Sequence, residues 1–237
     1  MKKIIVGIPS FNEANCIVKT TKIVDRAITR YFHNFYSLII NVDNNSPDHT
    51  KDFFLNTKTK NKKVSLLTSL PGKGRNILKL LKYAFRKKAD CVVTIDADIS
   101  TLQEDWIKKL ALPILKEEAD IVTPLYLRNR FESSTTNHFA FPVLLGYFNY
   151  YIRQPIGGEF AFSKKFIKTV LNESIVESTL FYGIDIFLTI TGIAYNFRFE
   201  QVFLGRKIHK PSFPKIDPMF EQVAFTTFNS LQKLIIF

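Results

Sequence analysis

The chain contains little cysteine. Its 237 residues include two, Cys16 and Cys91, which lie far apart and outside any metal-binding or redox spacing. Cys91 opens an apolar run and is expected to be a small buried hydrophobe. This usage argues against a cysteine-based metal site or redox pair, and it fits a reducing, cytoplasmic compartment.

Long hydrophobic runs are also lacking. No segment reaches the roughly 20 apolar residues that cross a bilayer, and the nearest candidate, 139–152, contains Pro142 and Asn149. The apolar stretch after Met1 is short and has no small-residue cleavage site, so we expect no signal peptide. Low-complexity tracts and internal repeats are absent too, which argues against disorder.

Charge of one sign is in excess. Lys and Arg number 33 against 21 Asp and Glu, which gives a net charge of +12. Such a balance suits nucleotide diphosphates, acidic acceptors, anionic membrane surfaces or nucleic acid, and equally an ordinary solvated basic surface. With 46% hydrophobic residues, the composition is typical of a globular protein with one well-buried α/β domain.

Strand and helix signals alternate through the first half. Short apolar runs predict buried strands at 3–8, 38–42, 64–67, 91–95 and 120–123. Helical spacing predicts helices between them at 14–31, 48–55 (with Asp48 as cap), 77–85 and 103–115. This alternation predicts βαβ units and a mostly parallel sheet, in which ligands bind at the carboxyl ends of the strands. The polar clusters lie at those ends: 9–13, 43–46, 72–74 and 96–98.

The second half is less regular. Its polar segment 128–137 is expected to be a long loop, and 155–159 a turn that enters 160–163. Residues 139–151 and 182–194 are expected to be helical, 201–205 to be a strand, and 231–237 to be a helix that stops abruptly. No linker is visible, so we assign one domain.

Asp96-Ala97-Asp98 follows a predicted strand and presents two carboxylates at its tip. Two like charges so close are unfavourable unless a cation or hydrogen-bond donors compensate. Mg²⁺ or Mn²⁺ takes oxygen ligands and bridges phosphates, so the pair can hold a metal beside a diphosphate. The alternative is two solvated aspartates that cap the next helix.

Other residues offer chemistry with less specific patterns. Gly72-Lys73-Gly74-Arg75 suits a diphosphate but lacks the P-loop spacing, and it can be a plain basic turn. His209 can bind Mn²⁺ or simply lie at the surface. Glu159 and Asp185 can orient a sugar, act as bases or cap helices. The arginines can hold an acidic acceptor or remain surface charges: Arg128, Arg130 and Arg153.

The first-half motifs resemble those of the GT-A glycosyltransferases. Residues 8–13, Ile-Pro-Ser-Phe-Asn-Glu, are similar to the opening Pro-x-Tyr-Asn-Glu motif, and 42–50 to the Val-Asp-Asp-Gly-Ser-x-Asp-x-Thr loop. Asn44 and Asn45 replace the second Asp and the Gly, so Asp43 alone carries over as a base-binding candidate. Asp96-Ala97-Asp98 takes the place of the metal motif.

Four segments of the second half resemble the mannosylglycerate synthase and glucosyl-3-phosphoglycerate synthase group: 153–160, 182–185, 204–209 and 217–223. The resemblance covers nearly the whole chain and implies a GT-A, Rossmann-like α/β fold. It divides the single domain, 1–237, into a nucleotide-sugar half, 1–125, and an acceptor and metal half, 126–237. Members of the group usually continue past the point where this sequence stops, so its C-terminus is expected to be truncated.

The resemblance also implies site residues. The nucleotide-sugar set is Pro9, Ser10, Asn12, Glu13, Asp43, Lys73, Gly74, Asp96, Ala97, Gly158 and Glu159. The metal set is Asp98, His209 and Asp96; the catalytic set is Asp185, Glu159 and Lys73; and the acceptor set is Arg128, Thr135, Thr136 and Asn137.

The implied activity is metal-dependent transfer of a hexose, with retention of configuration, from a GDP- or UDP-sugar to a small acidic acceptor such as glycerate or phosphoglycerate. Mg²⁺ or Mn²⁺ is the implied cofactor, a homodimer is an open expectation, and no nucleic-acid partner is expected. One alternative is a polyprenyl-phosphate transferase peripheral to a membrane. Another is a non-catalytic nucleotide or nucleic-acid binding protein.

Overall fold

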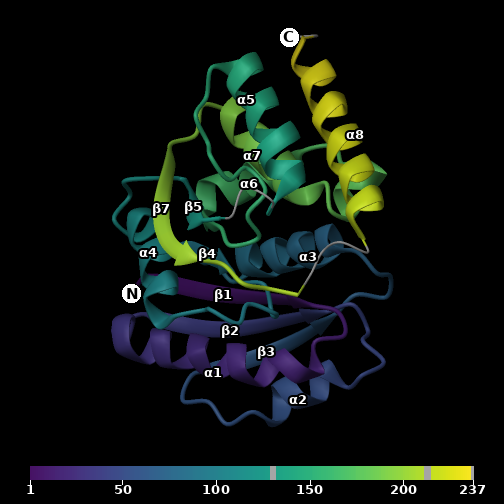
Figure 1. Ribbon diagram of the computed structural model, residues 1–237. Coiled ribbons are helices and arrows are strands. Elements are labelled where there is room, and N and C mark those ends of the chain that lie inside the picture. Colours follow the sequence, from purple (N-terminus) through teal and green to yellow (C-terminus); the bar gives the residue numbers. More distant parts are fainter. Residues whose placement is uncertain (129–131, 211–214, 236–237) are drawn as a thin grey trace.

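A seven-stranded sheet crosses the molecule in the order β3-β2-β1-β4-β6-β5-β7 (Figure 1). The computed structural model describes residues 1–128, 132–210 and 215–235. Its strands are β1 (Lys3–Ser10), β2 (Tyr36–Asp43), β3 (Lys62–Leu67), β4 (Cys91–Thr94), β5 (Ile121–Leu127), β6 (Ala161–Ser163) and β7 (Phe199–Arg206).

Within this described sheet every strand runs parallel to the others except β6, which is antiparallel to both β4 and β5. The prediction of a mostly parallel sheet is confirmed. The reversal has a local consequence at the end of β4, where Thr94 N donates to Phe160 O at 2.8 Å and Thr94 Oγ1 to Gly158 O at 2.8 Å. The segment that precedes β6 therefore lies against the carboxyl end of β4.

Helices cover both faces of the sheet. They are α1 (Ala14–Tyr31), α2 (Thr50–Asn56), α3 (Lys73–Arg86), α4 (Glu104–Leu115), α5 (Phe141–Phe148), α6 (Lys164–Asn172), α7 (Ile184–Ala194) and α8 (Ile216–Ile235). Side chains of α1, α2 and α4 pack into one core cluster, and those of α3, α6 and α7 into another on the opposite face. The helices α5, α7 and α8 stand together above the sheet (Figure 1).

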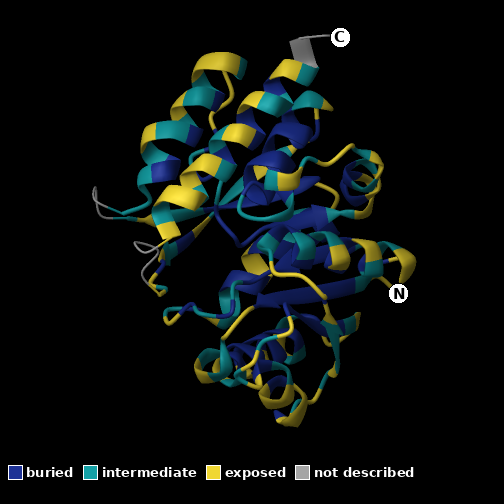
Figure 2. Ribbon diagram, turned by 90° about the vertical axis from the view of Figure 1, so that its right-hand side faces the viewer, coloured by how far each residue is buried: buried dark blue, intermediate teal, exposed yellow. Residues whose placement is uncertain are grey.

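Buried strands explain the continuous apolar runs of the sequence. In β1, Ile4, Val6 and Ile8 face the cluster of α1 and α4, while Ile5 faces the cluster of α3. Because both faces of a parallel sheet are covered, its central strands need apolar side chains on both sides. Figure 2 shows these strands as buried between helices whose outer sides are exposed.

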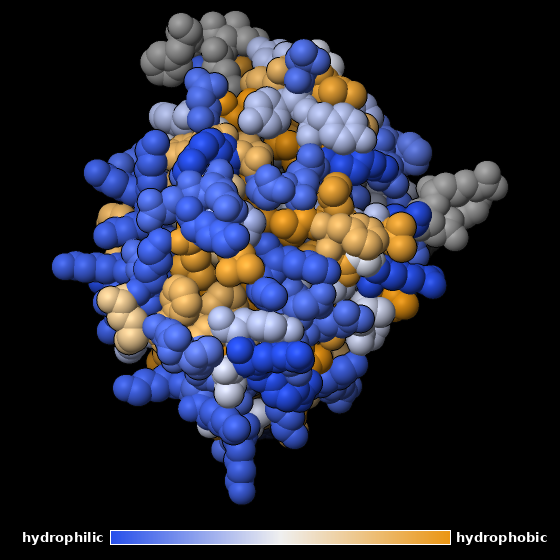
Figure 3. Space-filling view, turned by 90° about the vertical axis from the view of Figure 1, so that its left-hand side faces the viewer, coloured by the Kyte–Doolittle hydropathy of each residue, from blue (hydrophilic) through white to orange (hydrophobic). Residues whose placement is uncertain are grey.

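The surface carries apolar side chains in separate patches. On the face drawn in Figure 3, hydrophilic side chains predominate and hydrophobic ones gather between them. None of the helices in the described residues combines the length and apolar character that crossing a membrane requires.

Several predicted boundaries are wrong. Helix α3 begins at Lys73 and not at 77, and α8 begins at Ile216 and not at 231. Two further differences have local causes. The segment 128–137 is not a loop throughout, since residues 134–135 are helical and a π-helical turn, η1 (Thr136–Ala140), follows. There Asn137 N donates to Ser133 O at 2.9 Å. The polar composition of the segment therefore does not prevent a hydrogen-bonded helical turn. The helix α2 begins at Thr50 and not at Asp48, because His49 adopts the left-handed conformation while Asp48 Oδ1 accepts from Thr50 N.

Candidate active site

A cleft of about 850 Å³ opens where the strands end. Its walls come from the ends of β1, β4, β5 and β7, from the start of α3 and from α7 and α8. Polar clusters that lie far apart in the sequence thus meet at one rim, as predicted. The predicted residues that line the cleft are Pro9, Ser10, Glu13, Lys73, Asp96, Ala97, Asp98, Arg128, Thr135, Thr136, Asp185 and His209.

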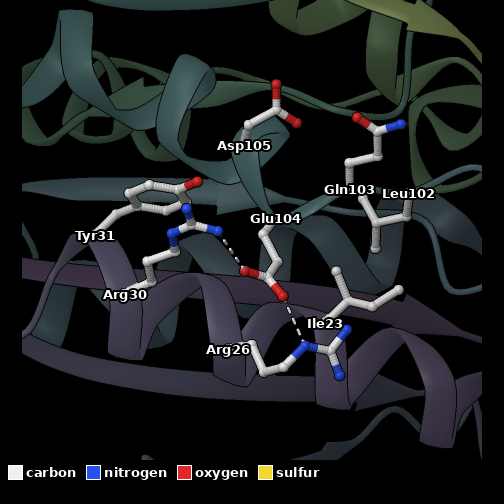
Figure 4. Close-up of a pocket in the computed structure, with 8 residues that line it drawn as sticks. All are labelled: Ile23, Arg26, Arg30, Tyr31, Leu102, Gln103, Glu104 and Asp105. Atoms are coloured by element: carbon white, nitrogen blue, oxygen red, sulfur yellow. Dashed lines mark hydrogen bonds and ion pairs between the residues drawn. The ribbon is translucent and has the colours of Figure 1, made fainter.

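A second hollow, of about 400 Å³, lies between α1 and α4 (Figure 4). Glu104 points between two arginines there, with Arg26 Nε 2.7 Å and Arg30 Nη1 3.7 Å from its carboxylate oxygens. Glu104 thus already binds both arginines of this hollow, and none of the predicted site residues lines it. The cleft at the strand ends is therefore the candidate site.

Asp43 supports the loop after β2 instead of lining the cleft. Its carboxylate accepts from Ser10 Oγ at 3.1 Å, from Ser46 N at 2.8 Å and from Ser46 Oγ at 2.6 Å. Asn12, also outside the lining, has a positive φ, and its backbone N donates to Ser46 Oγ at 2.9 Å. The neighbouring Asn44 does line the cleft. The Asp43 carboxylate is therefore engaged by hydrogen bonds within the protein. Its contact with the nucleoside base stays a prediction.

Lys73 begins α3 and reaches across the cleft. Its Nζ lies 3.2 Å from Asp185 Oδ2 and 3.4 Å from Asp96 Oδ1. Burial alone would lower the pKa of Lys73, but the carboxylates of Asp185 and Asp96 outweigh it and raise the pKa. The pKa of Asp185 is raised by burial, which Lys73 offsets only in part. The Lys73 ammonium is therefore paired with the carboxylates of Asp185 and Asp96.

The glycine Gly74 fits α3 against the turn that follows η2 (Glu177–Leu180). Its amide donates to Phe181 O at 3.0 Å, and a Cβ at this position would lie 1.9 Å from Thr179 O. Gly74 itself does not line the cleft. Its predicted place in the nucleotide site is thus indirect: it lets the backbone at the start of α3 approach closely enough to place Lys73.

The floor of the cleft holds an ion cluster that we call the floor cluster: Lys73, Asp96, Glu159, Asp185 and Lys207. Lys207 Nζ lies 2.6 Å from Glu159 Oε2, 3.2 Å from Asp96 Oδ2 and 2.9 Å from Gly157 O. Burial alone would raise the pKa of Asp96, but Lys73 and Lys207 hold it well below its usual range. The carboxylates of Glu159 and Asp96 outweigh burial and raise the pKa of Lys207.

Glu159 lies beneath the lining, fully buried. Its Oε1 accepts from Asp96 N at 3.2 Å and its Oε2 from the Tyr126 hydroxyl, so it ties β4 to β5. Burial raises the pKa of Glu159, and Lys207 opposes that shift only in part. Gly158 packs on the other side, where a Cβ would lie 2.2 Å from Asp96 Oδ2. Glu159 and Gly158 thus position Asp96 from beneath the cleft lining.

The side chains of Asp98 and His209 both contact the backbone of Lys210, in the segment after β7. Asp98 Oδ2 accepts from Lys210 N at 3.2 Å, and His209 Nδ1 lies 2.7 Å from Lys210 O. Because Nδ1 must donate to that carbonyl, the lone pair of the neutral ring lies on Nε2, where a metal can bind. Burial and Lys207 lower the pKa of His209, which favours the neutral form.

This donor set fits a divalent cation that completes its shell elsewhere. No group of three or more His, Cys, Asp or Glu side chains suited to a metal occurs in the described ranges. One carboxylate and one imidazole leave most positions of an octahedral ion for phosphate oxygens and water, as is usual for Mg²⁺ and Mn²⁺. A metal held by Asp98 and His209 would need further oxygen ligands, which phosphate groups and water can supply.

Of the residues predicted for the acceptor, Arg128, Thr135 and Thr136 line the cleft, whereas Asn137 and Arg153 lie outside the lining. The Arg128 guanidinium stacks on Tyr126 with its carbon 4.9 Å from the ring centre. Its Nε is a buried atom without a hydrogen-bond partner, as is the Nη1 of Arg153. A guanidinium with an unsatisfied donor at the cleft favours an anionic ligand. Arg130 lies outside the described residues.

Sequence reasoning missed Lys207, Tyr126 and Asn44. Lys207 stands in a basic segment and Tyr126 in an apolar strand, so neither pattern indicates a contact with Glu159. Asn44 replaces an expected acid, yet it binds Thr68 and Asn76 in a buried cluster at the cleft wall. The one sequence signal for Asn44 is its position directly after a predicted strand, at the edge of the sheet where ligands bind.

The glycosyl transferase family 2 model matches residues 5–171, which is most of the chain. The chain therefore belongs to this family and is a glycosyltransferase, as the motifs predicted. No curated protein matches the chain by sequence.

Solved structures with the same fold include glucosyl-3-phosphoglycerate synthase from Mycobacterium tuberculosis. Its complex with Mn²⁺, UDP and glucosyl-3-phosphoglycerate gives a TM-score of 0.78 at 23% identity, covering 97% of this chain and 80% of that one. The complex with Mg²⁺ and UDP gives 0.77 at 24%, covering 97% and 79%. A mycobacterial protein gives 0.78 at 21%, covering 97% and 74%. The likeness confirms the predicted GT-A fold.

The close approach at Gly74 gives a stability prediction. Gly74→Ala should lower the free energy of unfolding by about 1–3 kcal/mol, because the added methyl meets the backbone oxygen of Thr179. Gly146→Ala is the matched control, since it lies in α5 with nothing within 4 Å of the added Cβ. The control should be neutral or stabilising by up to about 1 kcal/mol. Urea titrations of both variants measure the difference, and equal values would contradict the predicted clash.

Proposed function

We propose that this member of glycosyl transferase family 2 transfers a hexose from a nucleoside diphosphate sugar to a small acidic acceptor, with Mg²⁺ or Mn²⁺ as cofactor. The observation that carries the proposal is that groups of both charge signs line one cleft. Asp98 and His209, the proposed metal ligands, share its lining with Lys73 and Arg128. One substrate with a diphosphate and one with an acid group would meet between them.

The donor half of the proposal is supported by the lining at β1 and α3. Pro9, Ser10 and Asn44 offer a polar wall for the nucleoside, and Lys73 is the cation placed to face the diphosphate. A divalent metal on Asp98 and His209 would offset the charge that grows on the departing nucleoside diphosphate. Lys73 would act in the same sense, since an ammonium near the leaving oxygen stabilises negative charge there.

The acceptor half is supported by Arg128 and its surroundings. Its unsatisfied guanidinium nitrogen can bind a carboxylate or phosphate, while Thr135 and Thr136 offer hydroxyls beside it. The solved relative of known activity carries phosphoglycerate or glucosyl-3-phosphoglycerate in several of its complexes. Glycerate and phosphoglycerate are therefore the acceptors to test first, with UDP-glucose as the first donor.

Retention of the anomeric configuration is supported by the floor cluster. Asp96, Glu159 and Asp185 each lie against a lysine, so each carboxylate is held by an ion pair and is poorly placed to deprotonate an acceptor hydroxyl. Catalysis then depends on positioning the two substrates and stabilising the leaving group.

The metal assignment is tested by ligand-dependent stability. In the wild-type chain, Mn²⁺ and UDP together should raise the unfolding midpoint more than either alone, because a ligand of the folded state stabilises it. Asp98→Ala and His209→Ala should each abolish the extra shift from Mn²⁺. Asp105→Ala and His33→Ala, outside the cleft lining, should keep it. A full Mn²⁺-dependent shift in both site variants would exclude these ligands.

The acceptor assignment is tested by steady-state kinetics. Arg128→Met should raise KM for glycerate or phosphoglycerate about 10- to 100-fold, the usual effect of losing a hydrogen bond to a charged group. KM for the donor should stay nearly constant. Arg86→Met, on the exposed side of α3, is the control. An unchanged acceptor KM in the Arg128 variant would place the acceptor elsewhere.

The stereochemical proposal has a direct readout. We expect the glycosidic product to have the anomeric configuration of the donor sugar, because the paired carboxylates offer no base for a direct displacement. Proton NMR of the freshly formed product measures this configuration. A product of opposite configuration would assign Asp185 or another acid of the cluster as a base.

A further inference from the structure

Lys207 is the most enclosed cation of the floor cluster. Its side chain is 5% exposed, and its ammonium lies within hydrogen-bond distance of Glu159 Oε2, Asp96 Oδ2 and Gly157 O. An ammonium has three N–H donors, and these three oxygens accept all of them. The group is therefore fully used within the protein and has no donor left for a ligand.

Lys73 differs in each of these respects. Its side chain is 21% exposed, and both of its carboxylate contacts are longer than 3 Å. It also starts a helix at the cleft wall, so its side chain can turn from Asp185 and Asp96 to an arriving diphosphate. The two lysines of the floor cluster thus suit different tasks. The Lys73 ammonium can contact a bound ligand, whereas the Lys207 ammonium is fully engaged by protein oxygens.

We propose that Lys207 is a positioning residue of this site, which keeps Asp96 and Glu159 side by side at the floor of the cleft. The proposal rests on the proposed glycosyl transfer.

The charge balance explains why such a residue is needed. Asp96 and Glu159 lie on one buried floor, and two carboxylates so placed repel unless a cation separates them. When Lys73 turns to a diphosphate, Lys207 remains as the cation that contacts both. Asp96 is also confined sterically, because the backbone at Gly158 passes so close that a Cβ would lie 2.2 Å from Asp96 Oδ2.

The same contacts separate the two acids of Asp96-Ala97-Asp98. Asp96 Oδ1 faces Lys73 and Asp96 Oδ2 faces Lys207. Asp98 faces the segment of His209 instead, where its Oδ2 accepts only from the backbone of Lys210 among the hydrogen bonds of the described residues. Asp96 is thus the acid of this motif that Lys207 contacts, whereas Asp98 lies outside the floor cluster.

A pair of variants separates positioning from a purely structural role. Lys207→Met removes the ammonium, and it should lower the unfolding midpoint by about 10 °C because a buried carboxylate pair loses its cation. The double variant Lys207→Met with Glu159→Gln removes one acid as well, and it should regain most of this loss. Its kcat should stay about 100-fold below that of the single variant Glu159→Gln, since Asp96 is no longer held in place.

The outcomes are distinct. If the double variant regains both stability and kcat, Lys207 serves stability alone and the proposal fails. If Lys207→Met leaves the midpoint unchanged, the described contacts do not matter and the proposal also fails. Should the single variant not fold, the double variant still decides the matter through its kcat. Lys109→Met, which removes an exposed pair with Asp105, is the control and should shift the midpoint by less than about 2 °C.

Failure of the wild-type chain to bind UDP would refute the proposed function itself, and the stability measurements on the Lys207 variants would still stand.

Discussion

The buried contact between Lys207 and Glu159 is the interaction on which the arrangement of the cleft depends. Glu159 also accepts from the amide of Asp96 and from Tyr126, so one carboxylate joins the ends of β4, β5 and β7. Charges buried this deeply are tolerated only when each has a partner at close range. Each carboxylate of the floor cluster is therefore ion-paired with Lys73 or Lys207, and these pairs restrict the positions of both partners.

The reversed strand β6 makes this contact geometrically feasible. A parallel strand at this position would send the preceding segment to the opposite edge of the sheet, away from the carboxyl ends where the ligand site forms. As an antiparallel strand, β6 is entered from that edge, and residues 157–160 pass directly beside the end of β4. The single antiparallel strand of the described sheet thus places Glu159 beneath a cleft that otherwise lies at the carboxyl ends of parallel strands.

The C-terminal helix takes part in the same site from the other side. Met219 and Val223 of α8 line the cleft, and Gln222 accepts from the amide of Tyr182 beside α7. Ser178 and Thr226 are hydrogen-bonded at 2.7 Å, which fixes the turn that receives Gly74. The cleft walls at α3 and at α8 are therefore coupled through one turn, although the sequence separates them by more than half its length.

The sequence by itself determined the strand and helix order of the first half, the rim where the polar clusters meet, and the family. These features depend on local periodicity and on short motifs, so 3–8 and 91–95 are recognisable as buried strands without any partner. The tertiary structure alone decided that Asp43 turns inward, that 134–137 form a helical turn, and that Lys207 reaches Glu159. Such contacts join residues far apart in the chain, and which of several basic or acidic side chains becomes buried depends on packing that no local pattern records.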